Sequence, residues 1–183
     1  EATVDAALSH LPADGSGRVV DVGTGSGAIA LALKKERAAL ELLAVDRSPD
    51  AAAVARANAE RLGLAVEILE GDLLAPVAAR APFVLIVSNP PYIPSPEIPT
   101  LAPEVRKEPL GALDGGPDGL AIVRRLIADA PPLLAPSGAL VLEVGAGQAP
   151  TVAALFPADG LSGPPTITKD LAGIDRVVAA RKK

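Results

Sequence analysis

A carboxamide, two prolines and a phenol follow a run of apolar residues in this chain, with one serine between them. The motif is Asn89, Pro90, Pro91 and Tyr92, and residues 83–87 before it (FVLIV) are typical of a buried strand. Pro90 biases Asn89 toward an extended backbone, and the two prolines fix two φ angles and remove two N–H donors. The rigid acceptors that remain suit a planar –NH2 group, as on an amide or a base amine. Because open α/β folds bind ligands at such strand ends, we expect these four residues to be catalytic, with a plain proline-rich turn as the alternative.

A glycine-rich turn forms a second candidate site, upstream of the first. Apolar residues 18–22 predict a strand, and a helical pattern begins at Ala28, directly after the turn. Glycines at such a turn permit positive φ and let a ligand approach the backbone closely. A strand over residues 42–45 ends at Asp46, about 20 residues past the turn, where a carboxylate can accept hydrogen bonds from ribose hydroxyls. We therefore expect a nucleoside to bind over the turn residues, which are Gly23, Thr24, Gly25, Ser26 and Gly27.

These two features leave the identity of the nucleoside open. Gly23, Gly25 and Ala28 also fit the G-x-G-x-x-A form of the dinucleotide fingerprint, so a nicotinamide cofactor is an alternative to S-adenosylmethionine. Asn89 and the three residues after it have no evident role in hydride transfer. This favours S-adenosylmethionine.

Adenine recognition is expected to depend on a loop acid and on aliphatic side chains. Residues 65–69 predict a third strand, and Asp72 follows it, suited to the adenine amino group or simply solvated. Aromatic residues are only 2% of the chain, so adenine is expected to lie between aliphatic side chains.

The composition limits the class of protein. The 183 residues suit one domain, 49% of them are hydrophobic, and the net charge of -5 argues against broad contact with a phosphate backbone. Cysteine is absent, so neither a disulfide framework nor a thiolate metal site is expected, and no metal is expected at all. The single histidine, His10, is expected at the surface without a partner. No stretch reaches the apolar length of a membrane span, and we expect a soluble, cytoplasmic protein without membrane contact.

Strands and helices alternate along the chain, with one long interruption. The connection over residues 93–118 is rich in proline and glycine, and a loop of this length is usually functional or disordered. The last two strands are expected to pair antiparallel and to close the sheet. The other expected elements are helices over residues 1–11, 49–61, 119–131 and 149–155 and strands over residues 139–144, 165–169 and 176–180.

The order of these motifs resembles the class I S-adenosylmethionine-dependent methyltransferases. More narrowly, the chain is similar to the release-factor glutamine N5-methyltransferase family (HemK/PrmC) over its whole length. The stretch from Glu104 to Leu120 is more specific to these enzymes than Asn-Pro-Pro-Tyr, which base-amine methyltransferases share. The matching segments are DVGTGSGAIALAL, AVDRSPDAAAVARANAERLGL, IVSNPPYIP, APEVRKEPLGALDGGPDGL, LVLEVGAGQ and KDLAGIDRVV.

The resemblance implies a Rossmann-like α/β fold with a mostly parallel seven-stranded sheet and helices on both faces. It implies S-adenosyl-L-methionine as the cofactor, with the glycine turn at its amino acid end, Asp46 at its ribose, and Asp72 and Leu73 at its adenine. Asn89 is expected to face both cofactor and substrate. The implied substrate is the glutamine of the Gly-Gly-Gln motif in peptide chain release factors, and the implied enzyme is a protein-(glutamine-N5) methyltransferase.

Residues 1–183 are then expected to form a single catalytic domain, and to act as a monomer without direct contact to nucleic acid. The family carries an N-terminal helical domain that this chain lacks, and we expect the chain to be a fragment. Two other functions stay open. One is a nucleic-acid methyltransferase acting on adenine N6 or guanine N2, which would use the same four residues on an extruded base. The other is a cofactor-binding module without activity.

Overall fold

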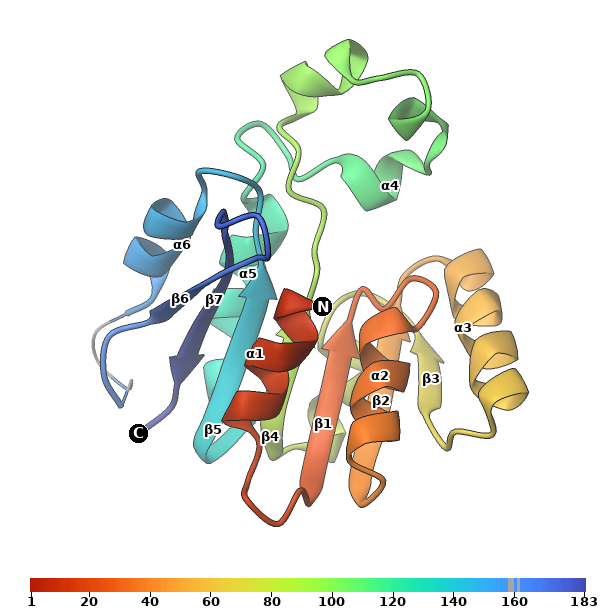
Figure 1. Ribbon diagram of the computed structural model, residues 1–183, viewed down its shortest axis with the longest axis vertical. Coiled ribbons are helices and arrows are strands. Elements are labelled where there is room, and N and C mark those ends of the chain that lie inside the picture. Colours follow the sequence, from red (N-terminus) through yellow and green to blue (C-terminus); the bar gives the residue numbers. More distant parts are fainter. Residues whose placement is uncertain (158–159, 161) are drawn as a thin grey trace.

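Seven strands form one sheet that lies between two layers of helices (Figure 1). The computed structural model describes residues 1–157, 160 and 162–183. All strands run parallel except β7, which is antiparallel to both of its neighbours. The α/β sheet with a closing antiparallel pair is therefore confirmed. In sheet order the strands are β3 (Glu67–Glu70), β2 (Leu40–Asp46), β1 (Gly17–Val22), β4 (Phe83–Ser88), β5 (Leu134–Glu143), β7 (Asp175–Arg181) and β6 (Thr166–Lys169).

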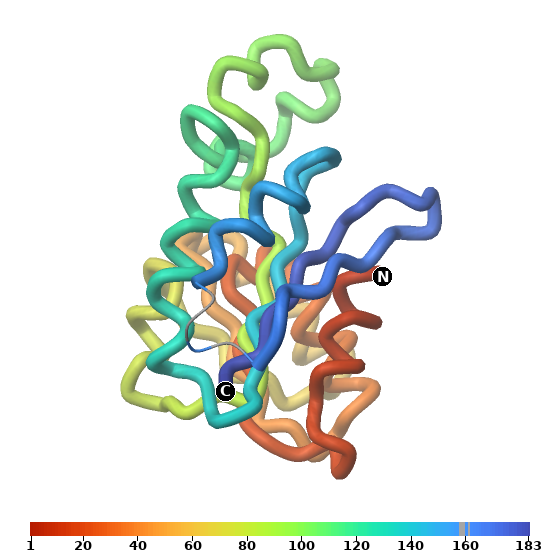
Figure 2. Tube along the Cα trace, turned by 90° about the vertical axis from the view of Figure 1, so that its left-hand side faces the viewer, coloured from red at the N-terminus to blue at the C-terminus, as the bar shows by residue number. Residues whose placement is uncertain are grey.

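Helices cover both faces of the sheet, as expected (Figure 1, Figure 2). One face carries α1 (Ala2–His10), α2 (Ala28–Glu36) and α3 (Pro49–Leu62). The other face carries α5 (Ala121–Asp129), α6 (Ala149–Leu155) and the short 3-10 helix η1 (Ala75–Arg80). The buried side chains of both layers are almost all aliphatic, and Phe83 is the one aromatic among the largest fully buried side chains of the described residues.

Capping residues fix the direction in which the chain leaves β2. Ser48 caps α3 by accepting a hydrogen bond from the Ala51 N–H at 3.3 Å, and Pro49 occupies the first helical position. Gly63 ends the helix with φ 65°. The sequence predicted this helix over residues 49–61. The cap holds the start of α3 next to Asp46, at the carboxyl end of β2.

The structure corrects several expected boundaries. The strand expected to start at residue 139 begins at Leu134, the helix expected from residue 119 begins at Ala121, and the third strand covers Glu67–Glu70 rather than residues 65–69. His10 is half-buried rather than at the surface, and burial lowers its pKa. Apolar periodicity locates a strand but not its ends, since the ends depend on hydrogen-bonding neighbours elsewhere in the chain.

Residues 93–118, named the arm below, project beyond the carboxyl ends of the strands (Figure 1, Figure 2). The sequence predicted a loop here, but the arm contains the 3-10 helices η2 (Ser95–Thr100) and η3 (Val105–Lys107) and the short helix α4 (Leu110–Leu113). A neck of backbone hydrogen bonds closes its base: Ile93 N–H donates to Leu113 O at 3.1 Å, Gly115 N–H to Ile93 O at 2.9 Å, and Ser95 N–H to Gly116 O at 2.8 Å. Short local helices suit a proline-rich segment because they require few backbone donors.

Candidate active site

A buried carboxylate supports the glycine turn from below. Asp21, in β1, is 1% exposed, and its Oδ2 accepts hydrogen bonds from the Thr24 hydroxyl at 2.7 Å and the Ala30 N–H at 3.1 Å. These bonds fix the start of α2 over the end of β1. Burial raises the pKa of Asp21 to about 6, and its Oδ1 has no hydrogen-bond partner among the described residues. No motif of the sequence singles out this residue, although an acid inside an apolar strand is a visible signal.

The glycines of the turn have a conformational need and open space above them. Gly23 has φ 70° and Gly25 has φ 57°, and a Cβ added at either would meet no heavy atom within 4 Å. Gly27 differs, because an added Cβ would lie 3.1 Å from a Leu31 methyl carbon. The turn thus packs against α2 at its far end and leaves its near end open, as a bound ligand would require.

Asp46 closes the side of this turn. Its Oδ2 accepts a hydrogen bond from the Gly25 N–H at 2.8 Å, and its Oδ1 accepts one from the Ser48 N–H at 2.9 Å. Gly23 N–H and Thr24 N–H both donate to the Val45 carbonyl, at 2.8 and 3.0 Å. Each carboxylate oxygen can accept a further hydrogen bond, so Asp46 can hold the turn and a ribose hydroxyl together. The Asp46 carboxylate and the backbone of the turn together fit the nucleoside end of S-adenosylmethionine.

The third expected cofactor segment has a different environment from the first two. Asp72 is exposed and forms an ion pair with Arg125 of α5 at 2.5 Å, a partner that the sequence did not reveal. Leu73 is half-buried and has φ 49°, an uncommon conformation for a residue with a side chain. Gly71 N–H donates to Asp46 O at 2.9 Å, so the segment begins beside the end of β2.

The Asn-Pro-Pro-Tyr motif follows β4 at the same edge of the sheet. Ser88, the last residue of β4, is buried and pairs with Val22, and its hydroxyl donates to the Val22 carbonyl at 2.7 Å. Asn89 is exposed, and its carboxamide forms no side-chain hydrogen bond within the described parts of the chain. Pro90 is buried, while Pro91 and Tyr92 are half-buried. The fold therefore brings the motif next to the glycine turn, since β1 and β4 are neighbours in the sheet.

One side chain connects the arm with the cofactor edge, by which we mean the glycine turn Gly23–Gly27 together with Asp46. Arg47 follows Asp46, and its guanidinium lies 3.5 Å from the Gly111 carbonyl in α4. A Cβ at Gly111 would lie 2.3 Å from the Arg47 Nη2 atom, so this glycine leaves room for the arginine. No local sequence pattern predicts this contact, because it joins residues 64 positions apart in the chain.

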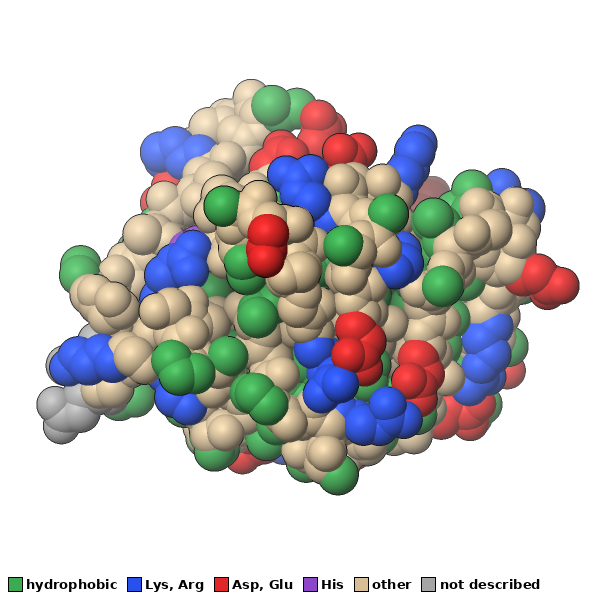
Figure 3. Space-filling model, turned by 90° about the horizontal axis from the view of Figure 1, so that it is seen from below, with side chains coloured by type: hydrophobic (Ala, Val, Ile, Leu, Met, Phe, Trp, Pro, Cys, Tyr) green, Lys and Arg blue, Asp and Glu red, His purple; other side chains and the backbone are tan. Residues whose placement is uncertain are grey.

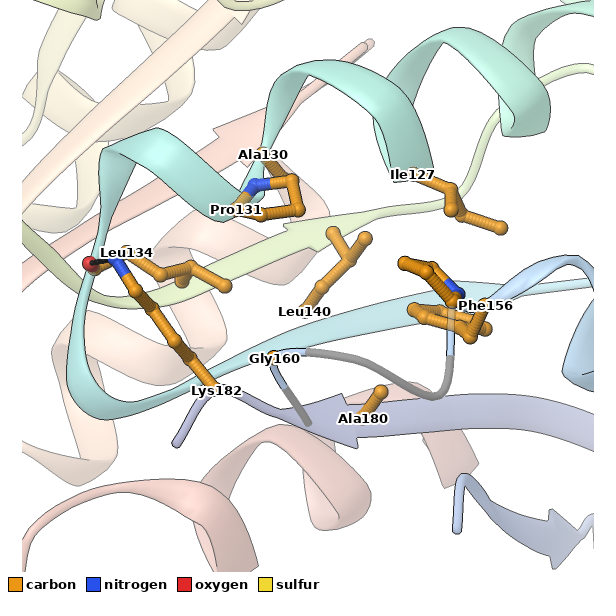
Figure 4. A pocket seen from close by; sticks show the side chains of 10 residues that line it. Ile127, Ala130, Pro131, Leu134, Leu140, Phe156, Gly160, Ala180 and Lys182 are labelled. Carbon is orange, nitrogen blue, oxygen red and sulfur yellow. Dashed lines mark hydrogen bonds between the residues drawn. The ribbon is translucent and has the colours of Figure 1, made fainter. Parts of the chain in front are cut away.

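Other features of the surface lie away from this edge. Figure 3 shows the end of the molecule opposite the arm, where some positive and negative side chains lie next to one another. Ion pairs of the structure include Arg18–Glu41 (2.8 Å) and Arg80–Glu67 (3.0 Å). A small apolar cavity of about 100 Å³ lies between α5, β5 and β7 (Figure 4), and Leu134, Leu140 and Lys182 contribute to its lining. No helix in the described residues is long and apolar enough to span a membrane, and no group of His, Cys, Asp or Glu in that part could hold a metal ion.

Solved structures share this architecture. A ribosomal protein L11 methylase from Lactobacillus delbrueckii subsp. bulgaricus has a TM-score of 0.69 and 22% identity, covering 99% of this chain and 77% of its own. TrmN from Thermus thermophilus has a TM-score of 0.68 and 21% identity, covering 98% of this chain and 48% of its own. At these identities the likeness establishes the fold, which is the expected class I methyltransferase fold.

Curated relatives are more similar in sequence. Release factor glutamine methyltransferase from Gloeobacter violaceus is 50% identical over 181 residues, which are 97% of this chain and 63% of the relative. The protein of the same name from Geobacter sulfurreducens is 46% identical over 182 residues, 99% of this chain and 63% of the relative. The chain therefore spans less than two thirds of the length of these relatives. The family described as "Methyltransferase small domain" matches residues 2–101, more than half of the chain. The chain belongs to the methyltransferase small domain family.

Proposed function

We propose that this chain is the catalytic part of an enzyme that transfers a methyl group from S-adenosyl-L-methionine to the side-chain nitrogen of glutamine in the Gly-Gly-Gln motif of peptide chain release factors. The single observation that carries the proposal is the Asn89 carboxamide, which is exposed, has no hydrogen-bond partner among the described residues and lies next to an open glycine turn. The names of the curated relatives support the choice of substrate. The proposal places a monomer in the cytoplasm, acting on a protein rather than on nucleic acid.

The cofactor fits the open side of the glycine turn. The backbone from Gly23 to Gly27 would hold its amino acid end, Asp46 would accept hydrogen bonds from its ribose hydroxyls, and Asp72 and Leu73 would border its adenine. When bound, S-adenosylmethionine supplies an electrophilic methyl group on a sulfonium. The chain's own part in this is to fix the acceptor amide beside that methyl group.

An amide nitrogen is a poor nucleophile because its lone pair is delocalised into the carbonyl. The Asn89 Oδ1 atom and the Pro90 backbone carbonyl provide two acceptors for the two N–H bonds of the glutamine amide. They orient the nitrogen for attack and stabilise the positive charge that develops on it, as an oxyanion hole does for negative charge. Pro91 and Tyr92 would form one side of the slot. No side-chain base is needed, because an alkylated amide nitrogen loses its extra proton readily to water.

The arm is proposed to form the other wall of the substrate slot. It leaves the sheet directly after Tyr92 and returns at the start of α5, so it borders the motif on the open side (Figure 1). Arg47 connects it with the cofactor edge through Gly111. A wall of short helices on a narrow neck suits a substrate that is itself a loop of another protein.

The proposal is tested by offering two classes of acceptor. The chain is incubated with S-adenosylmethionine carrying a labelled methyl group and either a release factor or ribosomal RNA. We expect label in the release factor and none in the RNA, and no label in a factor whose Gly-Gly-Gln glutamine is replaced by alanine. Label in the RNA alone would support a base-amine enzyme, and binding of cofactor without any transfer would support a module without activity.

A further inference from the structure

The oxygen and the nitrogen of the Gln148 carboxamide both form hydrogen bonds inside the protein. Its Nε2 donates to the Tyr92 carbonyl at 2.9 Å, and its Oε1 accepts a hydrogen bond from the Gly145 N–H at 2.8 Å. Gln148 stands at the N-cap position of α6, but its side chain does not cap that helix. The side chain instead joins the segment after β5 to the end of the Asn-Pro-Pro-Tyr motif.

Two glycines leave room for this contact. A Cβ added at Gly119 would lie 2.3 Å from the Tyr92 carbonyl oxygen and 2.7 Å from the Gln148 Nε2 atom. A Cβ added at Gly145 would lie 2.9 Å from the Gln148 Oε1 atom and 3.1 Å from the Tyr92 ring. The segments before α5 and after β5 are therefore both shaped around the pair formed by Tyr92 and Gln148.

Asn89 depends on its neighbours because its own side chain has no internal bond in the described residues. Upstream, Ser88 is fixed by pairing with Val22 and Leu142 and by its hydroxyl bond to the Val22 carbonyl. Downstream, the Tyr92 carbonyl is fixed by Gln148. Between these two anchors the prolines transmit backbone direction rigidly, since their φ angles are set by the ring. The backbone that carries Asn89 is therefore held on both sides, at Ser88 and at Tyr92.

We propose that Gln148 is a positioning residue for methyl transfer, which holds the Tyr92 carbonyl and through it aims the acceptors of Asn89 and Pro90. This inference rests on the proposed function and adds to it a residue 56 positions away from Tyr92 in the sequence. Gln148 contacts neither substrate nor cofactor in this account. Its loss should therefore affect the rate of transfer and not the binding of either.

Two variants and one control test the inference. Gln148→Glu keeps the length of the side chain and an acceptor for the Gly145 N–H, but faces the Tyr92 carbonyl with a carboxylate oxygen. Gln148→Ala removes both bonds. Thr166→Val is the matched control, because it removes a hydroxyl-to-carbonyl contact (to Ala179, 3.4 Å) on β6, away from the site.

We expect both Gln148 variants to lower kcat by about 10–100-fold, the scale of a misplacement near 1 Å at a reacting centre. KM for the release factor and the dissociation constant of S-adenosylhomocysteine should stay close to those of the parent, and Thr166→Val should leave all three unchanged. An unchanged kcat in both variants overturns the inference. So does a loss of cofactor affinity as large as the loss of kcat, since that would indicate a general structural role.

A second readout separates this inference from the proposed function. The side-chain amide resonances of Asn89 in ¹⁵N–¹H spectra of the free protein, identified by their absence in Asn89→Ala, report its environment without any substrate. They should shift in Gln148→Glu and Gln148→Ala but not in Thr166→Val. If the parent methylates no release factor, the proposed function fails, while shifted resonances still support the coupling of Gln148 to Asn89. Unshifted resonances reject that coupling whatever the substrate.

Discussion

The cofactor edge and the arm lie side by side at the carboxyl ends of the strands, but they are held in different ways. The glycine turn is fixed from below by Asp21, from the side by Asp46, and by two hydrogen bonds to the Val45 carbonyl. The base of the arm is held by its neck of backbone hydrogen bonds and by α5, through Ala121 N–H to Gly115 O (2.8 Å) and the ion pair Arg124–Asp118 (2.5 Å). Its outer part meets Arg47 at Gly111 in a contact at the 3.5 Å limit.

This difference matches two different binding tasks. A turn fixed in advance loses little free energy to its own ordering when a small cofactor binds. A loop of another protein must be admitted and then enclosed, which favours a wall with few contacts to the body. The motif stands between the two regions, attached to the rigid sheet through Ser88 and to the arm through Tyr92.

The largest expected effect is at the junction of the two regions. Asn89→Ala should lower turnover by roughly 10²–10³-fold, by analogy with the loss of one oxyanion-hole donor. Affinity for the cofactor should fall much less, because Asp46 and the glycine turn are unchanged. Asn89→Asp keeps an acceptor oxygen and should retain partial activity. Steady-state kinetics measure the turnover of both variants, and isothermal titration measures their affinity for the cofactor. A turnover of Asn89→Ala equal to that of the parent would mean that the motif is only a turn.

A second prediction concerns the buried carboxyl under the cofactor edge. Burial raises the pKa of Asp21 from 3.8 to about 6, so folding disfavours its charged form relative to the unfolded chain. Its contribution to stability is fully present below the unfolded pKa of 3.8 and is lost as the pH rises through about 6. Asp21→Asn removes this loss and should be more stable than the parent at pH 7, by at most about 3 kcal/mol.

Urea unfolding of the parent and of Asp21→Asn at several pH values tests the second prediction. The difference in the free energy of unfolding should grow as the pH rises from about 4 to about 6 and then level off. A difference that does not change with pH would mean that the effect comes from the hydrogen bonds of Asp21 rather than from its charge.

The third prediction concerns a substitution that weakens only the cofactor edge. Asp46→Ala should reduce the affinity for S-adenosylmethionine by roughly 1–3 kcal/mol, the scale of a lost charged hydrogen bond. Asp50→Ala is the control, since Asp50 is an exposed acid in the first turn of α3. Isothermal titration compares the two. Equal affinity in Asp46→Ala and the parent, or tight binding of NAD to the parent, contradicts the assignment of this edge.

The smallest expected effect concerns the arm. Backbone amides in residues 93–118 should exchange hydrogen faster than those of β1, because few contacts hold the arm to the body. Addition of a release factor should slow the exchange in the arm and leave β1 unchanged. Hydrogen exchange read by mass spectrometry distinguishes the outcomes. Exchange in the arm as slow as in β1, with no response to the factor, would mean that the arm is not a substrate wall.

The sequence predicted the features that local patterns encode. Apolar runs located the strands, the glycines marked the turn at Gly23–Gly27, and the helix expected from residue 49 begins at Pro49. The partners of the site residues could not be predicted in this way. The hydrogen bond from Gln148 to Tyr92 and the ion pair between Asp72 and Arg125 join residues 56 and 53 positions apart, and only the fold brings them together.

The arm shows a different limit of sequence reading. Its prolines suppress the apolar periodicity by which helices are recognised, and its helices are only three to six residues long. Asp21 was visible in the sequence but was read as part of a strand. Its role follows from the two hydrogen bonds to Thr24 and Ala30, which only the turn geometry reveals.

The central claim is that Asn89 presents a glutamine amide to the methyl donor, and fragment mass spectrometry of a methylated release factor tests it most directly. The factor is incubated with cofactor and either the parent chain or Asn89→Ala, then digested and sequenced in the spectrometer. The account predicts one added methyl group, located on the side chain of the Gly-Gly-Gln glutamine, with the parent, and little or none in the same time with Asn89→Ala. A methyl group on any other residue, or equal methylation by both proteins, would contradict it.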